Sequence, residues 1–149
     1  MQVQEDINTV KYDNIFQQAA LNITTTHHCL NNHMRDKLSP FALTVQQYHV
    51  LRILQQRLPM PATINLIKKR MVDKMSDASR IVERLIQKNL VVKSNNLSDR
   101  RASDIHLAPA GQQLLAEIAK MPIAETLLAD KLTTKEAEQL NLLLDKLRA

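Results

Sequence analysis

Two basic segments lie close together in the chain and carry the residue types best suited to chemistry. Residues 75–88 show helical periodicity, with apolar residues on one face and polar ones, among them Arg80, on the other. Residues 90–107 read as two short β-runs around a polar tip that contains Arg100 and Arg101. A helix can enter a DNA major groove, and an arginine-tipped hairpin can reach the neighbouring minor groove. The residue types therefore favour contact with double-stranded DNA.

The expected recognition helix, 75–88, offers side chains that can bond to bases or phosphates. Arginine can donate two hydrogen bonds to a guanine, and hydroxyl groups can bond to either partner. The candidates on this helix are Ser76, Asp77, Ser79, Arg80 and Arg84. On this helix alone, an ordinary polar face would be the simpler interpretation. The hairpin that follows favours DNA.

The hairpin tip supplies the second set of candidates, which are Ser98, Asp99, Arg100 and Arg101. An arginine there can enter a narrow A·T-rich minor groove, where the negative potential is enhanced. The alternative is a solvated turn with an exposed ion pair, worth about 0–1 kcal/mol. Weaker candidates, for phosphate contacts, are Lys68, Lys69, Arg70, Lys74 and Lys88.

The positive charge of the chain is concentrated in the same region. Residues 63–106 hold ten Lys or Arg and five Asp or Glu, which leaves a net charge of +5. The rest holds ten of each, so the whole excess of +5 lies in this segment. A localised basic stripe is typical of a protein that binds the phosphate backbone, although a solvated basic surface would give the same count.

The elements around these candidates are expected to be helical. The 149 residues suggest a single domain over 1–149, and one Gly with five Pro favours helix over tight hairpins. Helices are predicted over 8–38, from Thr44, over 63–71, from Pro109 with a break at Pro122, and from Thr133. Capping boxes open two of them, Thr44 with Gln47 and Thr133 with Glu136. The predicted fold is mainly α with a small β-wing, a winged helix-turn-helix.

Apolar stripes on the terminal helices require a partner surface. The stripes contain Phe16, Ile23, Leu140, Leu143, Leu144 and Leu147. A winged-helix core over 40–108 is too small to cover both, so 8–38 and 109–149 are expected to form a two-fold dimer. The alternative is that the terminal helices pack on each other within one subunit.

One cluster, His27, Cys29 and His33, has residue types that could bind metal or a ligand. Cys29 and His33 are four residues apart and share a helix face, but no second cluster completes a zinc site. His27 could line a ligand pocket or a dimer seam, or be an ordinary interface residue. Cys29 is the only cysteine, which precludes an internal disulfide and fits a reducing cytoplasm.

Other functional classes fit poorly. No apolar run approaches a membrane span, and Met1–Asp6 does not resemble a signal peptide, so a cytoplasmic protein without a membrane partner is expected. There is no phosphate-binding glycine loop, convincing catalytic pair or closed metal site. We therefore expect neither an enzyme nor a cofactor.

The order of several motifs resembles the MarR family of bacterial winged-helix transcription factors, over about residues 10–148. The matching pieces are Leu43-Thr44 with Gln47 and Leu51, Ser79-Arg80 with Arg84-Leu85, Asn89-Leu90-Val91, Asp99-Arg100-Arg101, Leu107 to Gly111, and Leu132-Thr133 with Glu136 and Leu140. Asn89 stands where the family has Gly, and Ala108 where it has Thr. Asn tolerates a left-handed backbone, and Pro109 still suits a first helical position.

The resemblance implies a homodimeric repressor on a pseudo-palindromic site, released by a small phenolic or lipophilic effector that binds between the DNA-binding and dimerisation regions. It also implies that Asp99 steadies Arg101 and that the terminal helices build the dimer. Some family members sense oxidants through a first-helix cysteine, so a redox- or metal-sensing regulator using Cys29 remains an alternative. A winged-helix protein-interaction module that does not bind DNA is the other.

Overall fold

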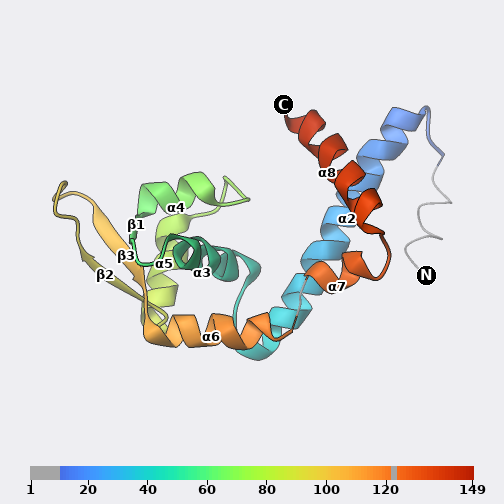
Figure 1. Ribbon diagram of the computed structural model, residues 1–149. Coiled ribbons are helices and arrows are strands. Elements are labelled where there is room, and N and C mark those ends of the chain that lie inside the picture. The colour runs from blue at the N-terminus through green and yellow to red at the C-terminus, as the bar shows by residue number, and fades with distance from the viewer. Residues whose placement is uncertain (1–10, 122–123) are drawn as a thin grey trace.

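The computed structural model describes residues 11–121 and 124–149. The chain is mostly helical, with one small antiparallel sheet that protrudes at one end (Figure 1), which confirms the predicted fold class. The elements in chain order are α2 (Ile15–Leu38), η1 (Ser39–Phe41), α3 (Val45–Arg57), β1 (Ala62–Thr63), α4 (Ile64–Arg70), α5 (Ala78–Gln87), β2 (Val91–Asn95), β3 (Ser103–Leu107), α6 (Pro109–Ala119), α7 (Ala124–Ala129) and α8 (Thr134–Arg148). None of the helices described has the length and apolar character needed to cross a membrane.

Both predicted capping boxes are formed. The Thr44 hydroxyl accepts a hydrogen bond from the Gln47 backbone N–H at 3.1 Å, and the Gln47 side chain accepts one from the Thr44 N–H at 3.2 Å. Thr133 and Glu136 make the same pair of bonds, at 3.2 and 2.8 Å, at the start of α8. These caps satisfy N–H groups that the first helical turn leaves without partners.

Two helices begin later than predicted. Helix α2 starts at Ile15 rather than at residue 8, because the Asn14 side chain caps it by accepting hydrogen bonds from two following N–H groups. Residues 8–10 lie outside the described residues. Helix α5 starts at Ala78 rather than 75, because the Asp77 carboxylate accepts a hydrogen bond from the Arg80 N–H at 3.1 Å. Ser76 therefore precedes the recognition helix.

The two departures from the family pattern are accommodated. Asn89 has φ of 59°, in the left-handed region, and the next N–H, of Leu90, donates back to Leu85 O at 3.1 Å. This closes α5 as a glycine would. Ala108 precedes α6 without a side-chain cap bond, and Pro109 takes the first helical position. Helix α6 ends at Ala119; the predicted break at Pro122 lies outside the described residues.

The wing is a hairpin extended by a third strand. Strands β2 and β3 pair antiparallel from Val91 opposite Leu107 to Asn95 opposite Ser103. The strand order is β1-β3-β2, with Ala62 of β1 opposite Ile105. The sequence analysis missed β1, because a pair of residues gives no detectable alternation. This strand joins the start of α4 to the base of the wing.

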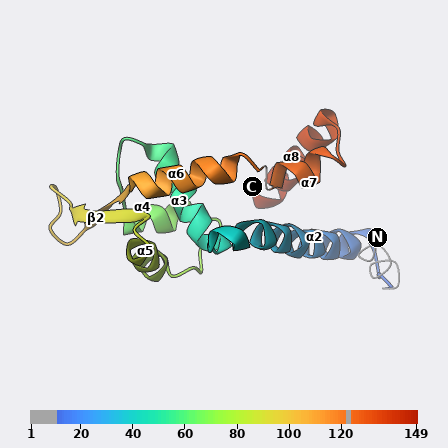
Figure 2. The same cartoon turned by 90° about the horizontal axis from the view of Figure 1, so that it is seen from below.

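The buried apolar core lies between Leu38 and Ile118. Its largest fully buried side chains are Leu38, Val50, Leu51, Leu54, Ile67, Met71, Val82, Leu85, Val91, Ile105 and Ile118. We call residues 38–118 the central module, and α2, α7 and α8 the terminal arm. The arm extends away from the module in both views (Figures 1 and 2). Leu38, where α2 enters the module, is the only described residue of these helices that is fully buried.

Candidate nucleic-acid interface

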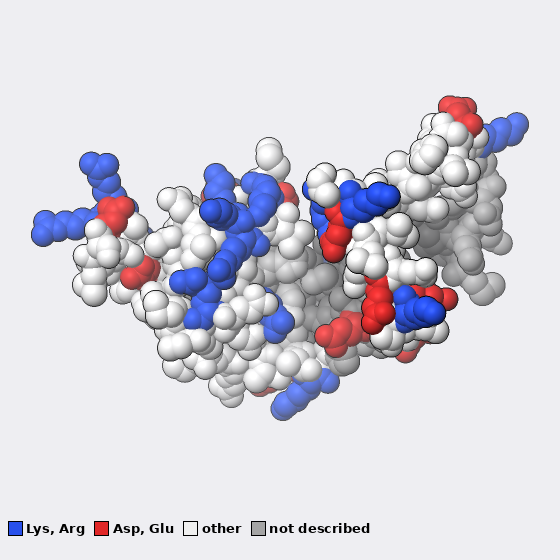
Figure 3. All heavy atoms as spheres, turned by 45° about the horizontal axis from the view of Figure 1, so that its top comes forward, with Lys and Arg blue, Asp and Glu red and all other residues white. Residues whose placement is uncertain are grey.

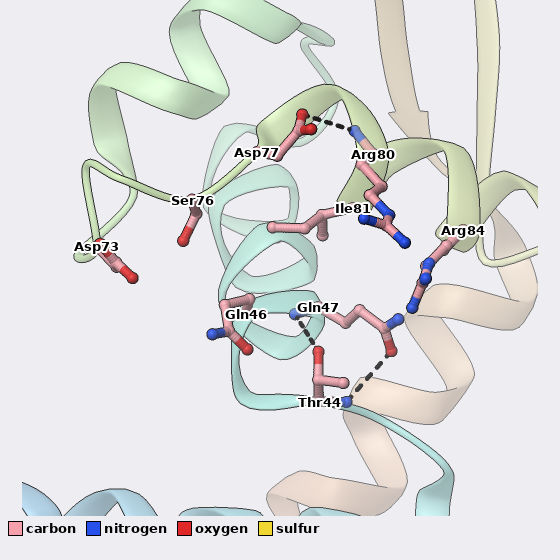
Figure 4. A pocket seen from close by; sticks show the side chains of 9 residues that line it. All are labelled: Thr44, Gln46, Gln47, Asp73, Ser76, Asp77, Arg80, Ile81 and Arg84. Carbon is pink, nitrogen blue, oxygen red and sulfur yellow. Dashed lines mark hydrogen bonds between the residues drawn. The ribbon is translucent and has the colours of Figure 1, made fainter.

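Two hollows lie next to the start of α5, one on each side of it. The first, which we call the α3-side hollow, has a volume of about 440 Å³ and lies between the starts of α3 and α5. It is lined by Thr44, Gln46, Gln47, Asp73, Ser76, Asp77, Arg80, Ile81 and Arg84 (Figure 4). The second, the α4-side hollow, has about 420 Å³ and is lined by Ile64, Asn65, Lys68, Lys74, Met75, Ser76, Asp77, Ala78 and Ser79.

Arg80 and Arg84 are one turn apart on α5 and line the α3-side hollow together. Figure 4 shows both side chains directed toward the region of Gln47, and both are exposed to solvent. The ion pairs recorded in the described part of the chain join Arg35 to Asp36 and Arg148 to Asp145. No carboxylate of that part therefore neutralises either guanidinium on α5, which leaves both available to an anionic partner.

The remaining recognition-helix candidates fall on different sides. Ser79 is exposed and lines only the α4-side hollow, whereas Ser76 and Asp77 line both hollows. The Asp77 carboxylate is engaged in capping α5, so its role here is to fix the helix start. The structure thus brings the predicted set together at one helix end, but it presents Ser79 and Arg80 to opposite sides.

The wing tip is ordered by hydrogen bonds from two short polar side chains. Asn96 Oδ1 accepts from the N–H groups of Ser98 and Asp99, both at 2.9 Å, and Asn96 Nδ2 donates to Asp104 Oδ1 at 2.8 Å. Asp99 Oδ1 accepts from the Arg101 N–H at 2.9 Å. The sequence analysis missed Asn96, although an asparagine at a turn is a signal for this arrangement.

Asp99 steadies Arg101 through its backbone. The hydrogen bond from the Arg101 N–H fixes the chain before the arginine, while no ion pair in the described residues joins Asp99 to Arg100 or Arg101. Both arginines are exposed at the tip. The alternative of a turn closed by a surface ion pair does not match this geometry. The geometry matches a turn that is held by hydrogen bonds to its backbone and that leaves both guanidinium groups exposed.

The candidates for phosphate contacts divide into two groups. Lys68, Lys69 and Arg70 form the exposed last turn of α4. Lys74 Nζ donates to the Lys69 carbonyl, and Lys88 Nζ donates to the Ala42 carbonyl and, at 3.1 Å, to Gln47 Oε1. Because these two ammonium groups already have protein partners, the exposed turn of α4 is the stronger candidate surface.

The basic side chains share one face of the molecule. In Figure 3, Lys and Arg protrude from the wing tip and gather on the neighbouring surface of the central module. The hollow lined by Lys93, Asp99 and Arg101, of about 350 Å³, connects the wing to Thr63 and Asn65 at the start of α4. In Figure 3 uncharged and acidic residues lie between these two groups of basic side chains, so the basic surface is divided between the wing tip and the module.

The predicted dimerisation residues are left largely uncovered within one chain. Phe16 is 78% exposed, Leu143 62% and Leu147 68%, while Ile23 and Leu140 are exposed and Leu144 is partly buried. Helix α8 has no buried residue. Packing of the terminal helices within one subunit therefore fails to cover the apolar stripe.

The residues His27, Cys29 and His33 do not converge on a site. His27 and Cys29 are exposed, and the neighbouring ring of His28 lies 5.6 Å from that of His27. His33 is partly buried, and its Nε2 atom has no hydrogen-bond partner among residues 11–121 and 124–149. Within the described ranges, no group of three His, Cys, Asp or Glu residues could hold a metal ion.

Comparison with solved structures finds proteins with the same fold. The chain matches a complex of Staphylococcus aureus MepR with DNA at 24% identity and a TM-score of 0.78, covering 86% of this chain and 94% of that one. A mutant of Escherichia coli MarR complexed with operator DNA matches at 21% identity and 0.79, covering 93% and 99%. Bordetella bronchiseptica BpsR, whose DNA binding is regulated by 6-hydroxynicotinic acid, matches at 21% and 0.75, covering 89% and 99%.

Sequence comparison gives the family. No curated protein matches the sequence of this chain. The sequence model of the MarR family matches residues 43–103, which span α3, the recognition helix and the wing tip. The resemblance found in the sequence is thereby confirmed. Residues 43–103 are a MarR-family domain, set in a chain that has the fold of the MarR-family structures.

Proposed function

We propose that this protein is a sequence-specific DNA-binding transcriptional regulator of bacteria. The carrying observation is that exposed arginines with no ion-pair partner among the described residues stand both on α5 and on the wing tip. The first set suits a major groove and the second a minor groove. The solved complexes of MepR and MarR with DNA support this use of the fold. Such a regulator would act in the cytoplasm, where the chromosome lies.

The proposed active form is a homodimer on a pseudo-palindromic operator. The uncovered stripe of Phe16, Leu143 and Leu147 supplies the apolar surface that an association needs. A two-fold axis repeats the recognition helix, and the half-sites then lie about one DNA turn apart, roughly 34–36 Å. We assign 40–108 to DNA binding, and 8–38 with 109–149 to dimerisation.

The regulator is proposed to be a repressor that a small phenolic or lipophilic molecule releases. A hollow of about 470 Å³ lies where α2 meets α3, lined by Asn31, Arg35, Ser39, Ala42, Leu43, Thr44, Val45 and Gln46. It borders both the terminal arm and the α3-side hollow, so an occupant could change the position of α5 relative to the arm. BpsR, regulated by 6-hydroxynicotinic acid, is a precedent for such a ligand.

The alternatives make different predictions. A winged-helix protein-interaction module would not bind duplex DNA, whereas a phosphate-backbone binder loses affinity steeply as salt rises. A sensor using Cys29 would lose its DNA affinity on oxidation, and a Cys29→Ser variant would not. The exposure of Cys29 permits such a reaction.

The decisive experiment is selection of bound sequences from random duplex DNA with purified protein. We expect a two-fold consensus. Arg101→Ala should then weaken binding to the selected duplex by about 1–3 kcal/mol without unfolding the protein, because it removes one wing contact. Arg52→Ala is the matched control, since it removes an exposed arginine of α3 that lines none of the three hollows next to α5, α4 and the wing and should leave affinity unchanged. Equal affinities of the two variants would refute the role of the wing.

A further inference from the structure

We propose that Met75 contacts the C5-methyl group of a thymine in the major groove and so helps to determine which DNA sequences are bound. The inference rests on the proposed function. It adds a specificity-determining residue that carries no hydrogen-bonding group and that the sequence analysis did not single out.

Met75 is held in place while its side chain stays in water. Its N–H donates to Asp73 Oδ1 at 3.0 Å, and the N–H of Ser76 donates to Asp73 O at 3.2 Å. The turn before α5 is therefore defined by hydrogen bonds. The Met75 side chain is nevertheless 92% exposed, directly before the helix end that usually meets base edges. The backbone of Met75 is thus held by hydrogen bonds at the place where a DNA major groove would approach.

The surroundings of Met75 are polar and basic. It lines the α4-side hollow with Lys68, Lys74 and Ser79, and with Asp77, whose carboxylate accepts the capping hydrogen bond of α5; Lys68 is the basic group there that can meet a phosphate. Among base edges in the major groove, the thymine methyl is the apolar feature, and apolar side chains contact it. Methionine adapts well to such a contact, because its side chain is flexible and polarisable. Duplex DNA offers a phosphate to the basic side chain of the hollow and a thymine methyl group to the Met75 side chain at its rim.

A second exposed apolar residue shows why the position matters. Leu97 is 102% exposed, but it lies at the wing tip, which is expected to face a minor groove. The minor groove does not display the thymine methyl. Val72, also before α5, is 77% exposed but does not line the α4-side hollow as Met75 does, so the methyl contact is assigned to Met75.

The test uses the duplex selected above, with dT replaced by dU at one position at a time. This replacement removes only the methyl group. The unaltered protein should bind about two- to fourfold more weakly when the contacted thymine of one half-site is replaced, as expected for one partly buried methyl. Replacing it in both half-sites should multiply the loss. Thermal unfolding checks that each of the Met75 and Met121 variants described next keeps the fold.

The variants connect the methyl group to Met75. Met75→Ala should bind the dT and dU duplexes equally, at about the affinity of the unaltered protein for the dU duplex. Met75→Leu should keep the difference, because it keeps apolar surface. Met121→Ala, which removes an exposed methionine after α6, should also keep it.

Three results would overturn the inference. If the unaltered protein binds every dU duplex as tightly as the dT duplex, no methyl is read, although the proposed function stands. If the penalty persists in Met75→Ala, the thymine acts through DNA shape or another residue. If no duplex is selected at all, the proposed function and the inference fail together.

Discussion

The central module and the terminal arm bury their apolar side chains to very different extents. In the module, Leu51, Ile67, Leu85 and Ile105 are fully buried. In the arm, α8 buries none of its residues, and Leu143 is 62% exposed. The hydrophobic contribution of the module is therefore realised within one chain. That of the arm requires a second surface, so the two regions should differ in how their stability depends on protein concentration.

The difference also explains how the two regions divide the proposed function. The module positions the DNA-facing side chains through its own core and hydrogen bonds. Lys88, for example, joins the end of α5 to Gln47 and Ala42 at the start of α3. The arm provides no DNA contacts in this account. Its contribution is to place a second module at the correct spacing on the duplex.

The largest effect should follow from charging the stripe of the arm. Changing both Leu143 and Leu147 to Asp removes about 1.5–3 kcal/mol of burial for each side chain at a dimer interface and adds charges there. Specific DNA binding should be lost together with the dimer, although every proposed contact remains in the module. Sedimentation measures the first effect and a gel shift the second. A double variant that still binds the selected duplex tightly would show that dimerisation is unnecessary.

A somewhat smaller effect is expected from truncation within the module. Leu54→Ala should lower the free energy of unfolding by about 2–5 kcal/mol, because it leaves a cavity in a core that cannot fully collapse. Chemical denaturation checks this. Phe16→Ala, in the exposed stripe, is the comparison, and its cost should appear only at concentrations where dimers form. Equal, concentration-independent losses for both would contradict the distinction between module and arm.

A substitution at Gly111 tests how closely α6 packs against Leu90 and Leu107. A Cβ added there would lie 2.3 Å from Leu90 O and 2.7 Å from Leu107 Cδ1. Gly111→Ala should therefore destabilise the module by about 1–3 kcal/mol through overpacking. Ala110→Ser, at the exposed neighbouring position, is the control. Unchanged stability of the Gly111 variant would mean that α6 can shift away from Leu90 and Leu107 at little cost.

Acidification should have the smallest effect and should act on the module. Burial lowers the pKa of His49 below its usual 6.5, since the charged form is disfavoured. The unfolded chain then binds a proton that the folded chain refuses, so stability falls as pH drops below about 6.5 toward the folded pKa. His49→Gln should make denaturation less sensitive to pH between 7 and 5. An identical pH dependence in the variant would remove His49 as the cause.

Local signals in the sequence were sufficient for most of the fold. Features that depend only on neighbouring residues appear as expected. They are the two capping boxes, the left-handed backbone of Asn89 and the start of α6 at Pro109. The start of α5 was placed at residue 75, inside the segment that precedes the cap; the Asp77 carboxylate accepts from the Arg80 N–H and begins the helix at Ala78. Strand β1 depends on pairing with β3, about 40 residues later, and left no local pattern.

The site was less predictable, because side-chain directions depend on distant partners. The recognition-helix and wing residues were found from their types and spacing. That Arg80 lines a hollow with Gln47 follows from the packing of α5 on α3. The engagement of Lys88 likewise depends on Gln47, 41 residues away. Met75 gave no signal in the sequence, since its exposure becomes visible only in the folded turn.

Sedimentation of the protein mixed with its selected duplex tests the central claim most directly. We expect a dimer at micromolar concentration in the absence of DNA. We also expect a complex of two chains per two-fold duplex, which dissociates as salt rises because counterions are released on binding. A protein that remains monomeric, or that forms no salt-sensitive complex with any duplex, would contradict it.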